Sequence, residues 1–425
     1  NAAIQEQLGK ISHSSFLGFT HPLAVELASR LCGFFPDGTL ERVFFSDDGS
    51  TAVECALKMA VQYRMQTGEP ERNRFVAFAN GYHGDTLGAA SLGGVGHFFE
   101  RFKGTGYPVQ HVSTLEELRT LPPAEIAGVV IEPLIQGVNE MRPWPAGMLT
   151  ELREWCDETG AHLILDEVMT GFGRTGKMFA CHHESVIPDF LCLAKGLTGG
   201  YLPMAATLTT GKIYDAFLGS PEKAFYYGHS YTANPLGCAA ALASLDLFES
   251  EQTFARLPEK IERLADGLAA LKSRHPMVHE VRQCGFIAGI ELRRPDGEKF
   301  PPGERFGESV LPFTDPDGMA LALVGIPGAE SEPGWSNGDV PAEHAIRGFH
   351  GVTLLLDSAA KTAAVLTDVF GFKETGREGS VIRFKVSGDA EGSVVDIYEA
   401  KGFLRGHQGG GSVHHIAFRA ADDAE

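Results

Sequence analysis

The stretch HLILDEVMTGFGRTGKMFACHHESVIPDFLCLAKGL, residues 162–197, decides the fold class of this chain. It contains two short apolar runs, of which the first ends in the carboxylates Asp166 and Glu167 and the second ends in Lys195. Charges at the point where a buried strand emerges cost free energy unless something there compensates them. The pattern therefore predicts two buried strands whose ends face one polar crevice.

The same kind of apolar run recurs along most of the chain. From residue 20 to about 300, short apolar strands alternate with amphipathic helices, as over 50–65 and 147–160. This alternation is typical of an α/β domain in which helices cover both faces of a mostly parallel sheet. The expected strands are 42–46, 74–79, 128–133, 161–167 and 189–195.

The last quarter of the chain has a different character. Residues 312–345 are rich in Pro, Gly, Asp and Glu, so we place a seam near residue 311. Beyond it we expect an α+β module in the order β-α-β-β-β. Its helix is expected over 358–371, and its strands over 349–356, 381–387, 393–400 and 413–420. The predicted division is 1–310, 311–345 and 346–425.

Charge and cysteine usage narrow the classes of function. The 425-residue chain has a net charge of -19, which disfavours a nucleic-acid partner because phosphate binding needs a basic face. Its seven cysteines include no Cys-x-x-Cys pair, which favours reduced thiols in the cytoplasm. No apolar run reaches the roughly 18 residues that span a bilayer, so no membrane partner is expected. Small-molecule chemistry is the best expectation.

The strand ends indicate one kind of chemistry. In a doubly wound sheet, ligands bind at the carboxyl ends of the strands, where Asp166 and Lys195 lie. A lysine there can form a Schiff base with an aldehyde, and an aspartate can keep a pyridinium nitrogen protonated. Together they indicate a pyridoxal phosphate site. Taken singly, each residue could instead belong to a surface ion pair or a helix cap.

Two further segments agree with such a site. In FFSDDGSTAVECALKMA, residues 44–60, Gly49, Ser50 and Thr51 open a helix whose amides could hold a phosphate, although a plain helix cap is the alternative. In NGYHGDTLGAASLGG, residues 80–94, Tyr82 could lie flat on a cofactor ring, although core packing is the alternative.

These segments, with IEPLIQG at 131–137 and GHSYTANPLGCAAA at 228–241, resemble the class III (fold type I) pyridoxal phosphate aminotransferases. The resemblance covers about residues 1–310. Within the family, the chain is most similar to the branch that aminates 8-amino-7-oxononanoate to 7,8-diaminononanoate in biotin synthesis. The nearest alternative is a transaminase for another omega-amino acid or a diamine.

The resemblance implies roles for five residues. Lys195 would bond to the cofactor and move the proton between the donor's alpha carbon and the cofactor. Asp166 would bind the pyridinium nitrogen, and Glu132 would support the site from its strand end. Val168 would pack against one face of the cofactor ring, while Tyr82 would cover the other.

The resemblance also implies partners. Gly49 and Ser50 would hold the cofactor phosphate, and a hydroxyl from the neighbouring subunit would reach the same phosphate, with Ser230 at that position and Thr232 nearby. The enzyme would therefore be a homodimer. It would work by a ping-pong mechanism, taking the amine from S-adenosylmethionine or lysine and passing it to the keto acid.

The resemblance to aminotransferases is incomplete. A complete enzyme would begin some tens of residues earlier and continue, after residue 310, into a small domain that carries an arginine for the substrate carboxylate. Arg282, Arg293 and Arg294 lie too early in the sequence to match that arginine. One alternative is therefore a non-catalytic truncated chimera, as an in-frame deletion would leave.

The C-terminal part resembles a glyoxalase-superfamily (vicinal oxygen chelate) ring-cleaving dioxygenase. Such proteins bind Fe(II) or Mn(II) through two His and one Glu. Here His415 lies at one ligand position, but Gly351 and Ala322 occupy the equivalent positions of the other ligands. One ligand cannot hold a catalytic metal, so none is expected. A dioxygenase fragment remains the alternative of a different class.

Overall fold

The structure is a computed structural model with two compact units, unit 1 (Asn1–Leu292) and unit 2 (Arg293–Glu425). The sequence analysis places its seam later, near residue 311, and that division stays a prediction. The structure describes residues 1–99, 102, 104–293, 304–314, 319–326, 328–329, 334, 345–386 and 392–400.

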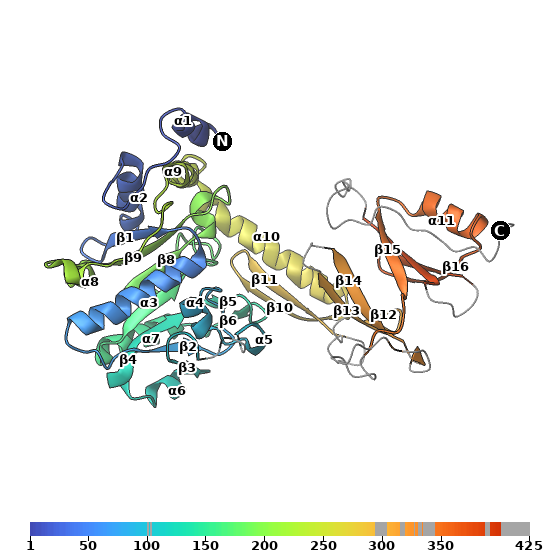
Figure 1. Cartoon of the computed structure of the whole chain (residues 1–425), viewed down its shortest axis with the longest axis horizontal. Coiled ribbons are helices and arrows are strands. Elements are labelled where there is room, and N and C mark those ends of the chain that lie inside the picture. Colours follow the sequence, from blue (N-terminus) through green and yellow to red (C-terminus); the bar gives the residue numbers. More distant parts are fainter. Residues whose placement is uncertain are drawn as a thin grey trace. The chain divides into compact units, whose positions relative to one another are not determined.

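Unit 1 is built on a seven-stranded sheet with the order β1-β9-β8-β7-β4-β2-β3 (Figure 1). The five strands β8, β7, β4, β2 and β3 are parallel to one another. Strand β9 is antiparallel to both of its neighbours, β8 and β1. The sheet is therefore mixed, and all five expected strands are present. The bounds are β1 Leu40–Ser46, β2 Arg74–Phe78, β3 Val109–Val112, β4 Ile126–Ile131, β7 His162–Asp166, β8 Phe190–Leu193 and β9 Ala205–Thr210.

Helices cover both faces of this sheet, as the α/β pattern predicts. Along β7, Leu163 and Leu165 pack into one hydrophobic cluster, and Ile164 packs into a second cluster on the opposite face. The first cluster includes α2, α7 and α9, and the second includes α3, α4 and α8. The bounds are α2 Pro22–Cys32, α3 Gly49–Gln66, α4 Leu87–Leu92, α7 Met148–Thr159, α8 Gly211–Asp215 and α9 Pro235–Ser250.

The remaining elements of unit 1 are short or lie outside the main sheet. After α9, the long helix α10 leads into a two-stranded antiparallel sheet of β10 and β11 (Figure 1). No helix in the described part of the chain is long and apolar enough to cross a membrane. The bounds are α1 Ala2–Leu8, α5 Gly96–Phe99, α6 Leu115–Arg119, α10 Thr253–Arg274, β5 Ile135–Gln136, β6 Arg142–Pro143, β10 Val278–Cys284 and β11 Ile287–Leu292.

Unit 2 contains a three-stranded sheet, β12-β13-β14, and a four-stranded sheet with the order β15-β18-β17-β16. In the larger sheet, β15 is parallel to β18, and the other pairs are antiparallel. The bounds are β12 Glu304–Arg305, β13 Glu308–Thr314, β14 Ala320–Gly325, β15 Gly351–Leu356, α11 Ala360–Asp368, β16 Lys373–Glu378, β17 Val381–Lys385 and β18 Val394–Glu399.

The larger sheet has the expected order β-α-β-β-β, but with a different set of strands. No strand was expected over 373–378, where β16 lies, and the last expected strand, 413–420, lies outside the described residues. The segment KETGRE was missed because it has no apolar alternation, and it can be a polar strand because β16 is at the edge of the sheet.

Candidate active site

The structure brings Asp166 and Lys195 to the same end of the sheet, where the parallel strands β7 and β8 have their carboxyl ends. Asp166 ends β7 and pairs in register with Cys192 of the parallel strand β8, and Lys195 follows β8 at the start of the short 3-10 helix η4 (Lys195–Thr198). Lys195 is exposed and has a φ of 42°, in the left-handed region that non-glycine residues rarely adopt. Strained backbone of this kind gathers at functional sites, so it favours a functional role for Lys195.

The carboxylate of Asp166 is buried and held on both oxygens. Its Oδ2 lies 2.8 Å from Nδ1 of His83, and its Oδ1 accepts a hydrogen bond from the Val168 amide at 3.1 Å. Burial lowers the pKa of His83, but the hydrogen bond to Asp166 and its charge raise it more, so the net pKa lies above its usual value. These two bonds fix the orientation of the Asp166 carboxyl, and the raised pKa of His83 favours the charged form of its imidazole.

A second strand-end carboxylate, Glu132, follows β4 and positions the residue before His83. Its Oε1 accepts from the Tyr82 amide at 3.1 Å, and its Oε2 accepts from the Gly137 amide at 2.8 Å. Burial raises the pKa of Glu132 against the opposing effect of the His83 charge. Glu132 and Asp166 thus hold two consecutive residues. This agrees with the supporting role predicted for Glu132.

The Tyr82 ring is fixed at its hydroxyl end. Its phenol donates a hydrogen bond to Oδ2 of Asp85 at 2.8 Å, and its ring lies 6.0 Å from that of Phe99. Burial, followed by the hydrogen bond to Asp85, raises the pKa of Tyr82 to about 12. The phenol is therefore neutral throughout the physiological range of pH.

The start of α3 lies against the end of β7. A Cβ added at Gly49 would come within 2.6 Å of Cγ1 of Val168, so only glycine permits this approach. Ser50 faces the Tyr82 loop, where its Oγ accepts a hydrogen bond from the Asp85 amide at 3.1 Å. Gly49 thus lies against Val168 and Ser50 against the Tyr82 loop, and the phosphate contact of Gly49 and Ser50 stays a prediction.

Thr51 has a local partner. Its amide donates to Oδ1 of Asp48 at 2.9 Å, and its hydroxyl oxygen accepts from the Asp48 amide at 3.1 Å, which completes a capping box. This is the cap that the sequence analysis gives as the alternative reading of the segment. A direct contact of the Thr51 hydroxyl with phosphate stays a prediction.

Ser230 and Thr232 lie in the turn that leads into α9. Thr232 is buried and its Oγ1 accepts a hydrogen bond from the His229 amide at 3.1 Å, whereas Ser230 is exposed. The exposed hydroxyl is the one free to reach another subunit. The role of both residues at a neighbouring phosphate stays a prediction.

Comparison with known proteins decides the family. The model of the family "Aminotransferase class-III" matches residues 1–325. The chain belongs to this family. It is a pyridoxal phosphate-dependent aminotransferase, and pyridoxal 5'-phosphate is its cofactor. All the residues predicted for the cofactor site lie within the matched range.

This aminotransferase is similar to several individual enzymes of known name or structure. It is 45% identical over 327 residues to adenosylmethionine-8-amino-7-oxononanoate aminotransferase of Geobacter sulfurreducens. The aligned residues cover 71% of this chain and 72% of the relative. The crystal structure of the enzyme of that name from Methanocaldococcus jannaschii has a TM-score of 0.68 and 42% identity, over 71% of this chain and 72% of the other. An omega-transaminase from Thermomicrobium roseum has a TM-score of 0.67 and 31% identity, over the same shares of 71% and 72%.

The residues present fit pyridoxal phosphate. The aminotransferase has a buried Asp166, paired with His83, at one strand end and the exposed Lys195 at the next. The start of α3 approaches Val168 so closely that a Cβ at Gly49 would come within 2.6 Å of its Cγ1. Sequence reasoning missed the contact of His83 with Asp166. The only signal was its position directly after Tyr82.

Unit 2 shows no metal centre in its described part. Among the residues that the structure describes, no group of three or more His, Cys, Asp or Glu could hold a metal ion. Gly351 opens β15 and Ala322 lies within β14, while His415 is outside the described residues. The prediction for His415 is therefore untested.

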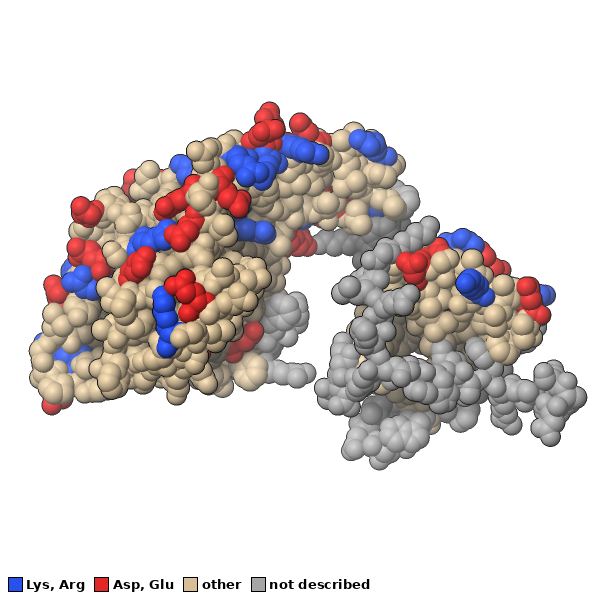
Figure 2. All heavy atoms as spheres, turned by 90° about the horizontal axis from the view of Figure 1, so that it is seen from above, with Lys and Arg blue, Asp and Glu red and all other residues tan. Residues whose placement is uncertain are grey.

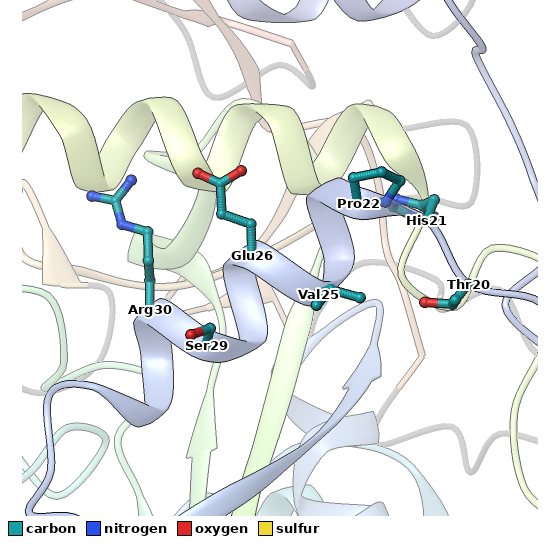
Figure 3. Close-up of a pocket in the computed structure, with 7 residues that line it drawn as sticks. All are labelled: Thr20, His21, Pro22, Val25, Glu26, Ser29 and Arg30. Atoms are coloured by element: carbon teal, nitrogen blue, oxygen red, sulfur yellow. The ribbon is translucent and has the colours of Figure 1, made fainter.

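One surface hollow of the aminotransferase lies along α2. It has a volume of about 640 Å³ and lies along the outer face of α2 and the loop before it, from Thr20 to Arg30 (Figure 3). Arg30 pairs there with Asp246 and Glu249 of α9. None of the predicted cofactor residues lines this hollow, so it is not the cofactor site. Acidic and basic side chains are interspersed on the face shown in Figure 2.

Proposed function

We propose that this aminotransferase transfers an amino group to 8-amino-7-oxononanoate, forming 7,8-diaminononanoate in biotin synthesis. The observation that carries the proposal is the 45% identity over 327 residues to a relative named for that reaction. Fold likeness alone would not separate the substrates, because an omega-transaminase superposes almost as well, with a TM-score of 0.67. The relative's name favours S-adenosylmethionine over lysine as the donor.

The residues of the site divide the work. When bound, pyridoxal phosphate supplies an aldehyde that takes up the donor amine and a ring that accepts electrons. Nζ of Lys195 would be the group that holds the cofactor, and the same amine would be placed to carry the proton of the donor's alpha carbon. Asp166, with His83 behind it, keeps the ring nitrogen protonated. Val168 and Tyr82 hold the ring in one orientation.

The phosphate would be held from two subunits. Gly49 and Ser50 present the first amides of α3, where the helix dipole favours an anion. Ser230, with Thr232 shaping its turn, would complete the cradle in a homodimer. Large aromatic side chains near this turn favour an interface, because Tyr226 is 79% exposed and Tyr231 is 60% exposed.

The cysteines and the larger sheet of unit 2 support two further proposals, one on where the enzyme works and one on what unit 2 is. The seven cysteines are all free thiols, which supports a cytoplasmic enzyme. The β15-β18-β17-β16 order, with β15 parallel to β18, supports one glyoxalase-like module in residues 346–425. The metal content of the purified chain would test whether that module is a dioxygenase fragment. Stoichiometric iron or manganese would favour it.

The function is tested by supplying purified, cofactor-loaded protein with 8-amino-7-oxononanoate and either S-adenosylmethionine or lysine. Mass spectrometry should detect 7,8-diaminononanoate with S-adenosylmethionine and no product from a Lys195→Ala variant. Transfer from a diamine or omega-amino acid to pyruvate, without amination of 8-amino-7-oxononanoate, would replace the proposed substrate. No transfer from any donor, in protein shown to be folded, would favour the non-catalytic chimera.

A further inference from the structure

Glu167, directly after Asp166, is a fully buried carboxyl that the proposed reaction does not use. Its exposed fraction is 0%. It accepts hydrogen bonds from the Ala180 amide at 2.6 Å, the Cys181 amide at 2.8 Å and the Thr170 hydroxyl at 3.3 Å. These three partners are all uncharged. A carboxyl buried among neutral donors is costly, so its presence needs a reason.

The side chain of Glu167 joins the two ends of one loop. The loop runs from Glu167 to Cys181, and its ends are closed by the two amides of the 3-10 helix η3 (Ala180–His183) that the carboxyl binds. Within the loop, the Gly171 amide donates to the Glu167 carbonyl at 2.9 Å. Compact loops with joined ends are often functional.

The start of this loop lies between Asp166 and Val168, the two residues proposed to hold the cofactor ring. The Glu167 amide donates to the Cys192 carbonyl of β8 at 3.0 Å, which fixes the backbone between Asp166 and Val168. The turn is tight there, because the Asp166 carboxylate accepts from the Val168 amide. Any rotation of the backbone at Glu167 would therefore move both the carboxylate and the side chain that packs on the ring.

The far side of the loop is anchored to the second sheet of unit 1. The Phe286 amide, in the turn between β10 and β11, donates to the Arg174 carbonyl at 2.8 Å. A Cβ on Gly285 would come within 2.5 Å of that same carbonyl oxygen. The loop is thus held at its tip by the β10–β11 turn and at its base by Glu167.

We propose that Glu167 is a positioning residue, whose carboxyl closes the Glu167–Cys181 loop and thereby keeps Asp166 and Val168 in register with the cofactor ring. The inference rests on the proposed cofactor site. It assigns to Glu167 a role in cofactor binding that goes beyond the stability of its own loop.

The chain offers a matched control in Glu184. Its carboxylate likewise accepts from two backbone amides and one threonine hydroxyl, namely Gly147 N at 3.2 Å, Thr150 N at 2.8 Å and Thr150 Oγ1 at 2.9 Å. These bonds hold the start of α7, and none of them involves a residue predicted to touch the cofactor. Its removal should cost stability without changing how the cofactor is bound.

The test compares Glu167→Ala and Glu167→Gln with Glu184→Ala and Glu184→Gln. We expect Glu167→Ala to weaken pyridoxal phosphate binding about tenfold or more, the size seen when residues behind metal ligands are removed. It should also alter the absorbance and circular dichroism of the bound cofactor. Glu167→Gln, which keeps the volume and one acceptor, should show a smaller loss and serves if the alanine variant does not fold.

Amide hydrogen exchange at Ala180 and Cys181 in cofactor-free protein gives an independent readout of the loop. Faster exchange in the Glu167 variants, with unchanged cofactor affinity and spectrum, would overturn the positioning role and leave Glu167 purely structural. Equal losses of cofactor affinity in the Glu167 and Glu184 variants would overturn it as well. If the wild-type protein binds no pyridoxal phosphate, the proposed function itself fails, and slow exchange at Ala180 and Cys181 would then show that an open loop is not the cause.

Discussion

Unit 1 and unit 2 each contain a buried aspartate on a strand, but they neutralise it in different ways. In unit 2, Asp396 of β18 lies directly opposite Arg383 of β17, and the guanidinium binds both carboxylate oxygens, each at 2.8 Å. Arg383 also pairs with Glu308 and stacks 4.2 Å from the centre of the Phe306 ring. The cluster in unit 2 therefore contains the cation, Arg383, that compensates its carboxylates.

In unit 1, the buried aspartate pairs with a histidine and not with an arginine. Asp166 lies 2.8 Å from Nδ1 of His83, while Lys195, at the end of the neighbouring strand, is exposed and has a left-handed backbone. Arg383, by contrast, is 4% exposed. The difference teaches that a buried aspartate paired with an arginine in its own cluster is structural, whereas one at the same end of the sheet as an exposed lysine with a strained backbone marks a binding site.

The largest effect is expected from removing the arginine that pairs with Asp396 in unit 2. Arg383→Met leaves Asp396 buried without its cation, which should destabilise unit 2 by about 3–5 kcal/mol. The double variant Arg383→Leu with Asp396→Leu should recover most of that loss, because no charge stays buried. Hydrogen exchange in β17 and β18 measures both effects. Unchanged protection in Arg383→Met would show that the cluster contributes nothing.

The next largest effect is expected on kcat, when the charge of Asp166 is removed. Asp166→Asn removes the charge that keeps the cofactor nitrogen protonated, and should lower kcat about 100-fold or more, as for other positioned proton-transfer groups. The matched control is Asp189→Asn before β8, because Asp189 binds the Leu163 amide at 2.8 Å and Arg153 at 3.0 Å without touching the site. That variant should lose stability and keep kcat. Near-normal kcat in Asp166→Asn would contradict the assignment.

A smaller effect is expected at the cradle. Gly49→Ala places a Cβ 2.6 Å from Cγ1 of Val168, and such overpacking typically costs about 1–3 kcal/mol. We expect roughly tenfold weaker binding of pyridoxal phosphate, measured by fluorescence titration. Adding Val168→Ala should recover part of the affinity. Gly267→Ala in α10, where an added Cβ meets nothing within 4 Å, is the control that should leave affinity unchanged.

The smallest effect is a dependence of stability on pH through Glu167. Burial raises its pKa from 4.5 to about 7. The folded state therefore binds more protons than the unfolded state between these values, so this contribution is full below pH 4.5 and is lost as pH rises through about 7. The slope is at most about 1.4 kcal/mol per pH unit. Denaturant unfolding of Glu167→Gln should show a flatter profile, and an unchanged slope would sink the idea.

The central part of the site could be predicted from sequence because it depends on strand ends. The apolar runs place Asp166 and Lys195 at the ends of β7 and β8, and the parallel pairing of these strands brings the two residues to one edge. The start of α3 was predictable for a similar reason, since Gly-Ser-Thr follows a strand. The structure adds that Thr51 belongs to a capping box with Asp48, a pattern the sequence already contained.

Other features could not be predicted because they depend on distant contacts or on weak patterns. The bond between His83 and Asp166 joins residues 83 positions apart, and nothing in the local sequence specifies it. The antiparallel insertion of β9 between β1 and β8 follows from how the chain returns to the sheet, which apolar runs alone do not record. In unit 2, β16 has no apolar alternation that would reveal it.

The central claim is that pyridoxal phosphate attaches to Lys195. It is tested most directly by treating the cofactor-loaded protein with borohydride and mapping the modified peptide by mass spectrometry, in wild type, Lys195→Ala and the control Lys177→Ala. We predict that wild type and the control keep the cofactor covalently on Lys195 and lose their visible absorbance band, while Lys195→Ala keeps none. Cofactor fixed on another lysine, or none fixed in folded wild-type protein, would contradict the account.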